Sequence, residues 1–151
     1  MELSIITVTW NSEKKIIEQI KSVAEACFGI NYEQIIVDNN SSDKTIDAVE
    51  TQNFVSVRLI VNKENAGFGS ANNQGVKISH GEFILFLNPD MRLESGSMLK
   101  MLQWMREKKD VGIASCKLVD AEGEFNWEAG PRRFPKVWEQ VCLLLKLPYI
   151  F

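Results

Sequence analysis

Cysteine and proline are scarce in this chain, and long apolar runs are absent. Its 151 residues include four prolines and three cysteines, and the cysteines are Cys27, Cys116 and Cys142. Because they stand far apart without a C-x-x-C pair, they argue against a disulfide framework and a zinc knuckle, and they fit a reducing compartment. No apolar run approaches the length of a membrane span, and the N-terminus lacks the basic segment of a signal peptide. We therefore predict a cytoplasmic protein.

An excess of positive charge is also missing. The formal net charge is −3, whereas proteins that coat nucleic acid usually show a basic face, so we expect no nucleic-acid partner. With 45% hydrophobic residues, the chain is long enough to bury one sizeable core.

Three common motifs of nucleotide binding and nucleophilic catalysis are absent. The first predicted strand is followed by 10–13, Trp-Asn-Ser-Glu, which has none of the glycines of a dinucleotide-binding G-x-G-x-x-G turn. The chain also has no P-loop and no G-x-S-x-G elbow. The single histidine, His80, has no nucleophile beside it, and we interpret it as a surface residue at the end of a helix.

Strand-like and helix-like segments alternate along most of the chain. The predicted strands are 3–9, 34–38, 55–61, 82–88 and 111–115. The first predicted helix begins at Asn11 or Ser12, which are good N-caps. A short second helix carries Ile46 and Val49, a third carries Ala71, Gly75, Val76 and Ile78, and a fourth lies at about 96–109. Repeated β-α units of this kind predict an α/β fold, with a mostly parallel sheet flanked by helices on both faces.

Polar residues follow the first four of these strands. They are Thr9, Trp10 and Asn11, then Asp38, then Asn65, Gly67 and Gly69, and finally Asn88 and Asp90. In a parallel sheet these positions meet at the carboxyl edge, where ligands of α/β proteins bind. A planar base could lie near Trp10 and donate to Asp38, while a pyrophosphate could approach the Gly67 loop and Asp90 could hold a cation.

The tripeptide Asn88-Pro89-Asp90 is the most informative of these positions. It ends the apolar run 83–87, which predicts a strand buried on both faces, and Pro89 must stop that strand. Taken alone, the tripeptide fits a turn as well as a metal site. Asp38 likewise fits an Asx-turn, Trp10 a core residue and the glycines ordinary turns. Their occurrence together at one edge favours a nucleotide site.

Four ordered motifs resemble family 2 glycosyltransferases, which have the Rossmann-like GT-A fold. The motifs are 8–11, 37–43, 65–75 and 86–90. The resemblance covers roughly 3–135 and is strongest to the rhamnosyltransferase-like branch that builds bacterial surface polysaccharides, which shares a loop like Arg-Arg-Phe-Pro at 132–135. It implies transfer of a sugar, with inversion, from a nucleotide-diphosphate donor to a polysaccharide or lipid-linked acceptor.

The resemblance also implies roles for individual residues. The donor-binding residues would be Thr9, Trp10, Asn11, Asp38, Asn65, Gly67, Asn72 and Asn88. Asp90 would be the last acid of a D-x-D motif that ligates Mg²⁺ or Mn²⁺. Because Asn88 replaces the first acid of that motif, metal binding should be weaker than with two carboxylates. The catalytic base would lie in an acidic motif beyond this chain; Glu128 is the nearest isolated acid, and we assign it no role.

Two regions are expected along the chain. Residues 1–116 would form the nucleotide-sugar-binding core, and 117–151 would begin an acceptor-side region that opens with a hairpin at 117–125. The apolar sequence at 148–151 suggests a fragment of a longer protein. The basic and apolar segment 131–151 allows peripheral association with the inner face of the membrane, or a homodimer, although packing against a further part of the protein is favoured.

Two other functions remain open from the sequence. One is a non-catalytic nucleotide-binding module, since no general base is evident. The other is a sugar-nucleotide pyrophosphorylase, although the glycine-rich signature of that class, with Arg and Lys near the first strand, is absent.

Overall fold

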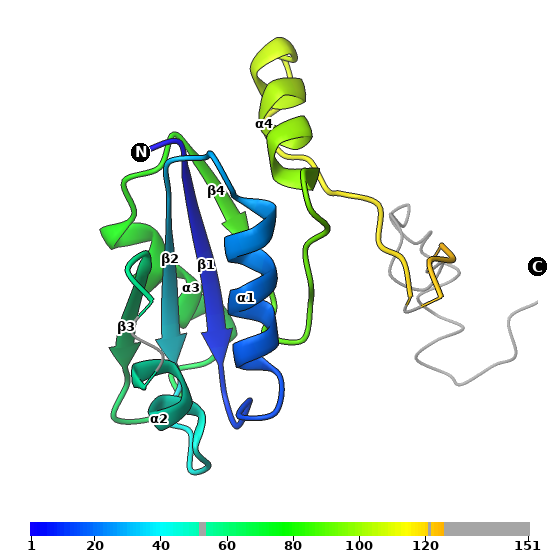
Figure 1. The fold of residues 1–151 in the computed structure, drawn as a ribbon. Coiled ribbons are helices and arrows are strands. Elements are labelled where there is room, and N and C mark those ends of the chain that lie inside the picture. The colour runs from blue at the N-terminus through cyan, green and yellow to red at the C-terminus, as the bar shows by residue number, and fades with distance from the viewer. Residues whose placement is uncertain (52–53, 121, 126–151) are drawn as a thin grey trace, which may run out of the picture. The chain divides into compact units, whose positions relative to one another are not determined.

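The computed structural model describes residues 1–51, 54–120 and 122–125. The chain divides into two compact units, Met1–Gly112 and Ile113–Phe151. The first unit is an α/β layer structure (Figure 1). Its strands are β1 (Leu3–Thr9), β2 (Tyr32–Asp38), β3 (Val57–Val61) and β4 (Phe83–Phe86), and its helices are α1 (Ile16–Ala26), α2 (Thr45–Glu50), α3 (Phe68–Ile78) and α4 (Ser97–Glu107).

The sheet is parallel throughout, with the strand order β3-β2-β1-β4. The central strands β1 and β2 are rich in β-branched residues and are almost wholly buried, as expected where helices cover both faces. Thr9 pairs with Asp38, and Asp38 pairs with Val61, so β1, β2 and β3 end side by side. The predicted α/β fold with a mostly parallel sheet is confirmed.

Helices cover both faces of this sheet. Figure 1 shows α1 in front of the sheet and α3 behind it. On the α1 face, Ile5 packs with Val23 of α1 and Leu102 of α4. On the other face, α3 comes very close to β1, because Gly75 has no side chain: a Cβ there would lie 2.6 Å from Cγ2 of Ile6.

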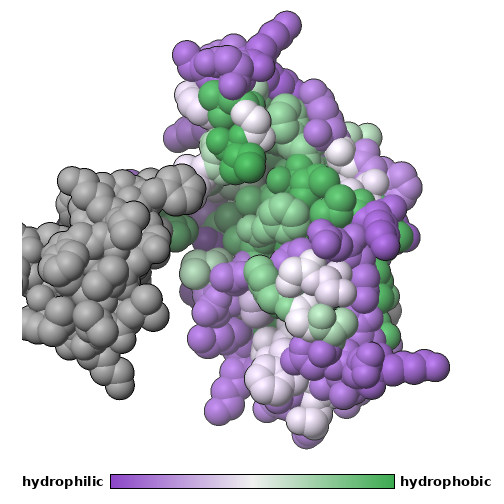
Figure 2. Space-filling model, turned by 180° about the vertical axis from the view of Figure 1, so that it is seen from behind, coloured by the Kyte–Doolittle hydropathy of each residue, from purple (hydrophilic) through white to green (hydrophobic). Residues whose placement is uncertain are grey.

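The prediction that β4 is buried on both faces is wrong. Ile84 is 40% exposed and Phe86 is 55% exposed. Phe83 and Leu85 pack into the core on the α1 face, so the alternate residues point to the α3 face, where α3 covers β1 and β2. Figure 2 shows that face, with apolar surface gathered over β4. Within the described residues β4 has a strand neighbour on one side only, and an apolar run cannot reveal that it lies at an edge.

Two element boundaries also differ from the sequence prediction. Helix α1 begins at Ile16 without a side-chain cap, because the Asn11 side chain accepts a hydrogen bond from Ser42 in the loop after β2 and the Ser12 hydroxyl donates to the Trp10 carbonyl. Residues 111–115 form no strand in the described part of the chain. Ile113 is 93% exposed, and the described sheet has no strand beyond β1 to β4.

The predicted hairpin near 117–125 is confirmed where the structure describes it. Val119 and Phe125 form an antiparallel bridge, and Gly123 adopts φ +84° in the turn. Asp120 accepts a backbone hydrogen bond from Gly123 and donates one to Glu124.

Among the described residues, no helix combines the length and the apolar character needed to cross a membrane.

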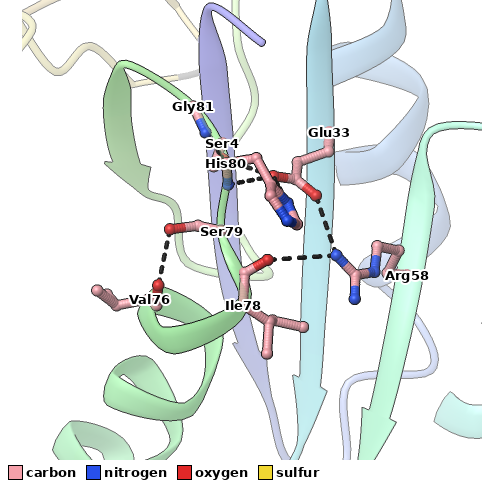
Figure 3. A network of polar contacts seen from close by, with 8 residues as sticks. All are labelled: Ser4, Glu33, Arg58, Val76, Ile78, Ser79, His80 and Gly81. Carbon is pink, nitrogen blue, oxygen red and sulfur yellow. Dashed lines mark hydrogen bonds and ion pairs between the residues drawn. The ribbon is translucent and has the colours of Figure 1, made fainter.

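A buried carboxylate joins the strands at the opposite, amino edge of the sheet (Figure 3). Glu33 of β2 accepts a hydrogen bond from the Ser4 hydroxyl at 2.8 Å and one from the backbone N–H of His80 at 2.7 Å. Arg58 of β3 lies 3.4 Å from its other oxygen. The His80 side chain is largely exposed, which confirms the prediction of a surface residue beyond a helix end.

Candidate functional site

A cavity of about 740 Å³ opens at the carboxyl edge of the sheet. Its walls come from the segments that follow β1, β2, β3 and β4, as the parallel topology requires. Six of the predicted site residues line it: Thr9, Trp10, Asn11, Asn65, Asn88 and Asp90. Three others, Asp38, Gly67 and Asn72, are not among the lining residues.

Trp10 lies on the cavity wall rather than in the core. It is 60% exposed, so the alternative interpretation of a core residue is wrong. A second exposed aromatic residue, Phe68 at the start of α3, lines the same cavity. Sequence reasoning missed Phe68, although it stands inside the motif at 65–75. Exposed aromatic rings offer stacking surfaces for a planar base.

Asp38 lies behind the cavity, fully buried at the end of β2. Its carboxylate accepts hydrogen bonds from the Thr9 hydroxyl at 3.0 Å, the Ser41 backbone N–H at 2.8 Å and the Ser41 hydroxyl at 2.5 Å. The Ser41 contacts are those of an Asx-turn. In this structure Asp38 therefore ties β1 to the β2–α2 loop, and contact with a nucleotide stays a prediction.

Asn39, next to Asp38, reaches the cavity instead. Its Oδ1 accepts hydrogen bonds from the side-chain amide of Asn62 at 3.0 Å and from the backbone N–H of Ala66 at 3.3 Å. These bonds fix the loop after β3 beside β2. Asn39 was not among the predicted site residues, and its position in the 37–43 motif is the signal that could have identified it.

Gly67 and Asn72 shape the α3 side of the site. Gly67 adopts φ +83° directly before α3, a conformation that favours glycine, and its N–H donates to Oδ1 of Asn65 at 3.0 Å. The Asn72 amide donates to the Phe68 carbonyl at 3.1 Å inside α3. Both residues therefore support the cavity wall from behind.

Asn11 links the two loops on the other side of the cavity. It adopts φ +52°, and its Oδ1 accepts a hydrogen bond from the Ser42 backbone N–H at 2.8 Å. Asp43 of the same loop accepts from the Glu13 N–H at 3.1 Å. Burial alone would raise the pKa of Asp43, but this bond and those from Thr45 hold the pKa below its usual value. Asp43 is therefore ionised, and both of its carboxylate oxygens accept hydrogen bonds from the surrounding loops.

Asn88-Pro89-Asp90 forms a turn at the rim of the cavity, so the two interpretations of the tripeptide are compatible. Strand β4 ends at Phe86, and the Asn88 carbonyl accepts a hydrogen bond from the Met91 N–H at 3.1 Å. The Asp90 carboxylate is 46% exposed, and its nearest charged partner among the described residues is Nζ of Lys15, 4.0 Å away.

The side chains at this turn fit a divalent cation only if a bound diphosphate supplies further oxygen ligands. The described residues hold no cluster of three His, Cys, Asp or Glu side chains suited to a metal. Mg²⁺ is commonly held by one or two carboxylates, with substrate phosphates and waters completing the octahedron. One free carboxylate on Asp90 and the amide oxygen of Asn88 meet that description.

Comparisons with known proteins agree with this geometry. Residues 4–149 match the sequence model described as "Glycosyl transferase family 2". The chain is 30% identical over 126 residues to the minor teichoic acid biosynthesis protein GgaB of Bacillus subtilis, a match that covers 81% of this chain and 14% of that protein.

Solved structures show the same architecture. The crystal structure of Staphylococcus aureus TarS 1–349 in complex with UDP-GlcNAc matches with a TM-score of 0.66 and 30% identity, over 72% of this chain and 32% of that one. A Pyrobaculum calidifontis mannosyltransferase, PcManGT, in complex with GDP-Man and Mn²⁺, matches with a TM-score of 0.63 and 24% identity, over 69% of this chain and 32% of that one, and supports the fold alone.

The chain spans well under half the length of these proteins. Its parallel sheet with flanking helices is the GT-A architecture that the sequence predicted. The chain belongs to glycosyl transferase family 2.

Proposed function

We propose that this chain is the donor-binding part of an inverting glycosyltransferase that takes its sugar from a nucleotide-diphosphate donor. The observation that carries the proposal is the cavity at the carboxyl edge, where the exposed ring of Trp10 and the available carboxylate of Asp90 line one space. An aromatic surface suits the base, and an acid at the rim suits the diphosphate through a cation.

The individual site residues are assigned within this proposal. Trp10 lies against the base, and the amides of Asn65 and Asn88 contact the polar parts of the donor. Thr9, Asn11, Asp38, Gly67 and Asn72 belong to the site mainly through the loop geometry that they hold. This assignment rests on the cavity lining and on the hydrogen bonds described above.

A divalent cation, Mg²⁺ or Mn²⁺, would be held by Asp90 and Asn88 together with the donor's phosphate oxygens. It would supply electrostatic stabilisation of the departing nucleoside diphosphate. With a single carboxylate, we expect the chain to hold the metal much more tightly when a diphosphate is present.

The general base is expected to lie elsewhere in the protein. An inverting transfer needs a group that accepts the proton of the acceptor hydroxyl. On the cavity wall, Glu13 accepts a hydrogen bond from the Lys44 backbone N–H at 2.9 Å, and Asp43 accepts one from the Thr45 backbone N–H. Glu128 lies outside the described residues. We expect residues 1–151 alone to bind donor but to transfer sugar poorly, and efficient transfer by this chain would contradict the expectation.

The acceptor and the branch within the family are further proposals. GgaB is named for teichoic acid biosynthesis, and other relatives are named as poly(ribitol-phosphate) glycosyltransferases, which supports a cell-surface polymer as acceptor. A rhamnosyltransferase-like specificity, a lipid-linked acceptor, a cytoplasmic location at the inner face of the membrane and a homodimer stay predictions. The segments 131–151 and 132–135, on which several of these depend, lie outside the described residues.

Isothermal titration calorimetry tests the proposal. The 151-residue chain is titrated with UDP-GlcNAc, dTDP-rhamnose and GDP-mannose, each with Mg²⁺, with Mn²⁺ and with neither. We expect one nucleotide to bind and its affinity to rise with metal. Absence of binding to every nucleotide would refute the proposal. Binding without transfer by a protein that carries all family motifs would favour the non-catalytic module.

A further inference from the structure

The residue before α1, Lys15, faces Asp90, the one acid on the described cavity wall whose carboxylate accepts no hydrogen bond. Its Nζ lies 4.0 Å from Oδ2 of Asp90, and the two side chains are 64% and 46% exposed. Both line the cavity. They come from the segments after β1 and β4, which are neighbouring parallel strands, so the sheet itself places them together.

The remaining acids of the cavity wall hold the loops around it. Glu13 accepts a hydrogen bond from the backbone of Lys44, and Asp43 accepts from Glu13 and Thr45. These bonds hold the loops in place, whereas the Asp90 carboxylate accepts no hydrogen bond among the described residues. Of the two lysines on the described cavity wall, Lys14 and Lys15, it is Lys15 that lies beside Asp90.

A lysine and a divalent cation compete for one carboxylate. A metal ion lies about 2 Å from its oxygen ligand, so an ammonium group on the same carboxylate would be a close like charge and would be repelled. An exposed ion pair of this kind is weak, and Lys15 can leave it. The acceptor it would find in an occupied site is the diphosphate, since lysine binds phosphate well as a mobile point charge.

We propose that Lys15 occupies Asp90 in the free protein and moves to the donor's diphosphate when a cation takes its place. The inference rests on the proposed function and adds to it a specific partner for the diphosphate. It also accounts for how a site with asparagine at position 88 neutralises the phosphates: one metal ligated by Asp90 shares the task with a lysine of the protein.

Two titrations of Lys15→Ala test the proposal with opposite expected signs. In the first, electron paramagnetic resonance measures the binding of Mn²⁺ alone, and the variant should bind it roughly threefold more tightly, because a competing charge is gone. The second titration uses whichever of UDP, GDP and dTDP binds the wild type. Calorimetry compares the affinity for this diphosphate with the affinity for the corresponding monophosphate. The variant should bind the diphosphate about tenfold more weakly and the monophosphate within about twofold of wild type.

Matched variants separate this role from a general charge effect. Lys21→Ala removes the same charge from an exposed position on α1 outside the cavity lining and should behave as wild type in both titrations. Lys15→Arg should restore most of the diphosphate affinity. An unchanged Mn²⁺ affinity in Lys15→Ala, or an unchanged preference for diphosphate over monophosphate, overturns the proposal. If the wild type binds no nucleotide, the proposed function fails, and the Mn²⁺ titration still decides the competition at Asp90.

Discussion

Replacing Glu33 by glutamine removes one charge from the amino edge of the sheet and keeps the shape of the side chain. Glu33 is 5% exposed and accepts two short hydrogen bonds, from Ser4 and from the backbone N–H of His80, at 2.8 and 2.7 Å. The residue thereby joins β1, β2 and the segment after α3 (Figure 3).

The expected loss of stability follows from these contacts. A hydrogen bond to a charged group contributes about 1.5–3 kcal/mol and a neutral one about 0.5–1.5 kcal/mol, so each of the two bonds weakens by about 1 kcal/mol. The Arg58 pair adds little, because its side chain is half exposed and its Nη1 also donates to the Ile78 carbonyl. We expect Glu33→Gln to lower the free energy of unfolding by about 2 kcal/mol near neutral pH.

The same contacts give the effect a definite pH dependence. Burial alone would raise the pKa of Glu33, but the Ser4 hydroxyl, the His80 N–H and Arg58 together hold the pKa below its usual value of 4.5. A carboxylate with a lowered folded-state pKa contributes stability above the unfolded-state pKa, and the contribution is lost as the pH falls through the folded-state pKa. The difference between wild type and Glu33→Gln should therefore shrink below about pH 4.5.

Urea unfolding followed by circular dichroism measures this difference near pH 7 and again below about pH 4. Glu25→Gln, an exposed change of the same charge on α1, is the matched control and should stay within about 0.5 kcal/mol of wild type. A Glu33→Gln loss below about 0.5 kcal/mol at neutral pH, or an equal loss in acid, would show that the Glu33 charge does not stabilise the amino edge.

Three further changes test other parts of the account. Gly81→Ala places a Cβ 2.3 Å from the backbone N of Ser4, and because backbone cannot yield, we expect a loss of about 3 kcal/mol or insoluble protein; a wild-type melting temperature would contradict this. Asp90→Asn should remove the gain in nucleotide affinity that Mn²⁺ gives and, because it releases Lys15, should leave the metal-free diphosphate affinity at or above that of wild type; a metal-dependent gain that survives would exclude Asp90 as ligand. Trp10→Ala should weaken nucleotide binding by about 1–3 kcal/mol in calorimetry, while circular dichroism stays native, since the ring is exposed.

The parallel sheet and its functional edge could be predicted because they depend on local pattern. The β-branched runs of β1 and β2 identified central strands, and the polar residues after each strand identified the edge where the cavity lies. Residues whose partners are distant in sequence could not be assigned in this way. Asn11 resembles a helix cap, but its side chain accepts hydrogen bonds from the backbone N–H groups of Ser42 and Asp43, which lie 31 and 32 positions further along the chain.

Neighbouring residues at a strand end were also beyond prediction. Asp38 points inward to Thr9 and Ser41, whereas Asn39 reaches the cavity, and this alternation depends on where the strand stops. An apolar run such as 83–87 reports hydrophobicity but not position in the sheet, so the exposed face of β4 appears only in three dimensions. Glu33 gives no sequence sign of its burial, because its partners lie in three other segments.

The central claim is that a nucleoside diphosphate binds at the carboxyl edge of the sheet. Two-dimensional ¹⁵N NMR of the 151-residue chain, titrated with UDP, GDP or dTDP in the presence of Mg²⁺, tests it most directly, with the indole N–H of Trp10 as reporter. We expect the largest shifts on Trp10 and on the backbone amides of Asn65, Asn88 and Asp90, with little change at Glu33 and Arg58. Shifts centred on the amino edge, or no shift with any of the three nucleotides, would contradict it.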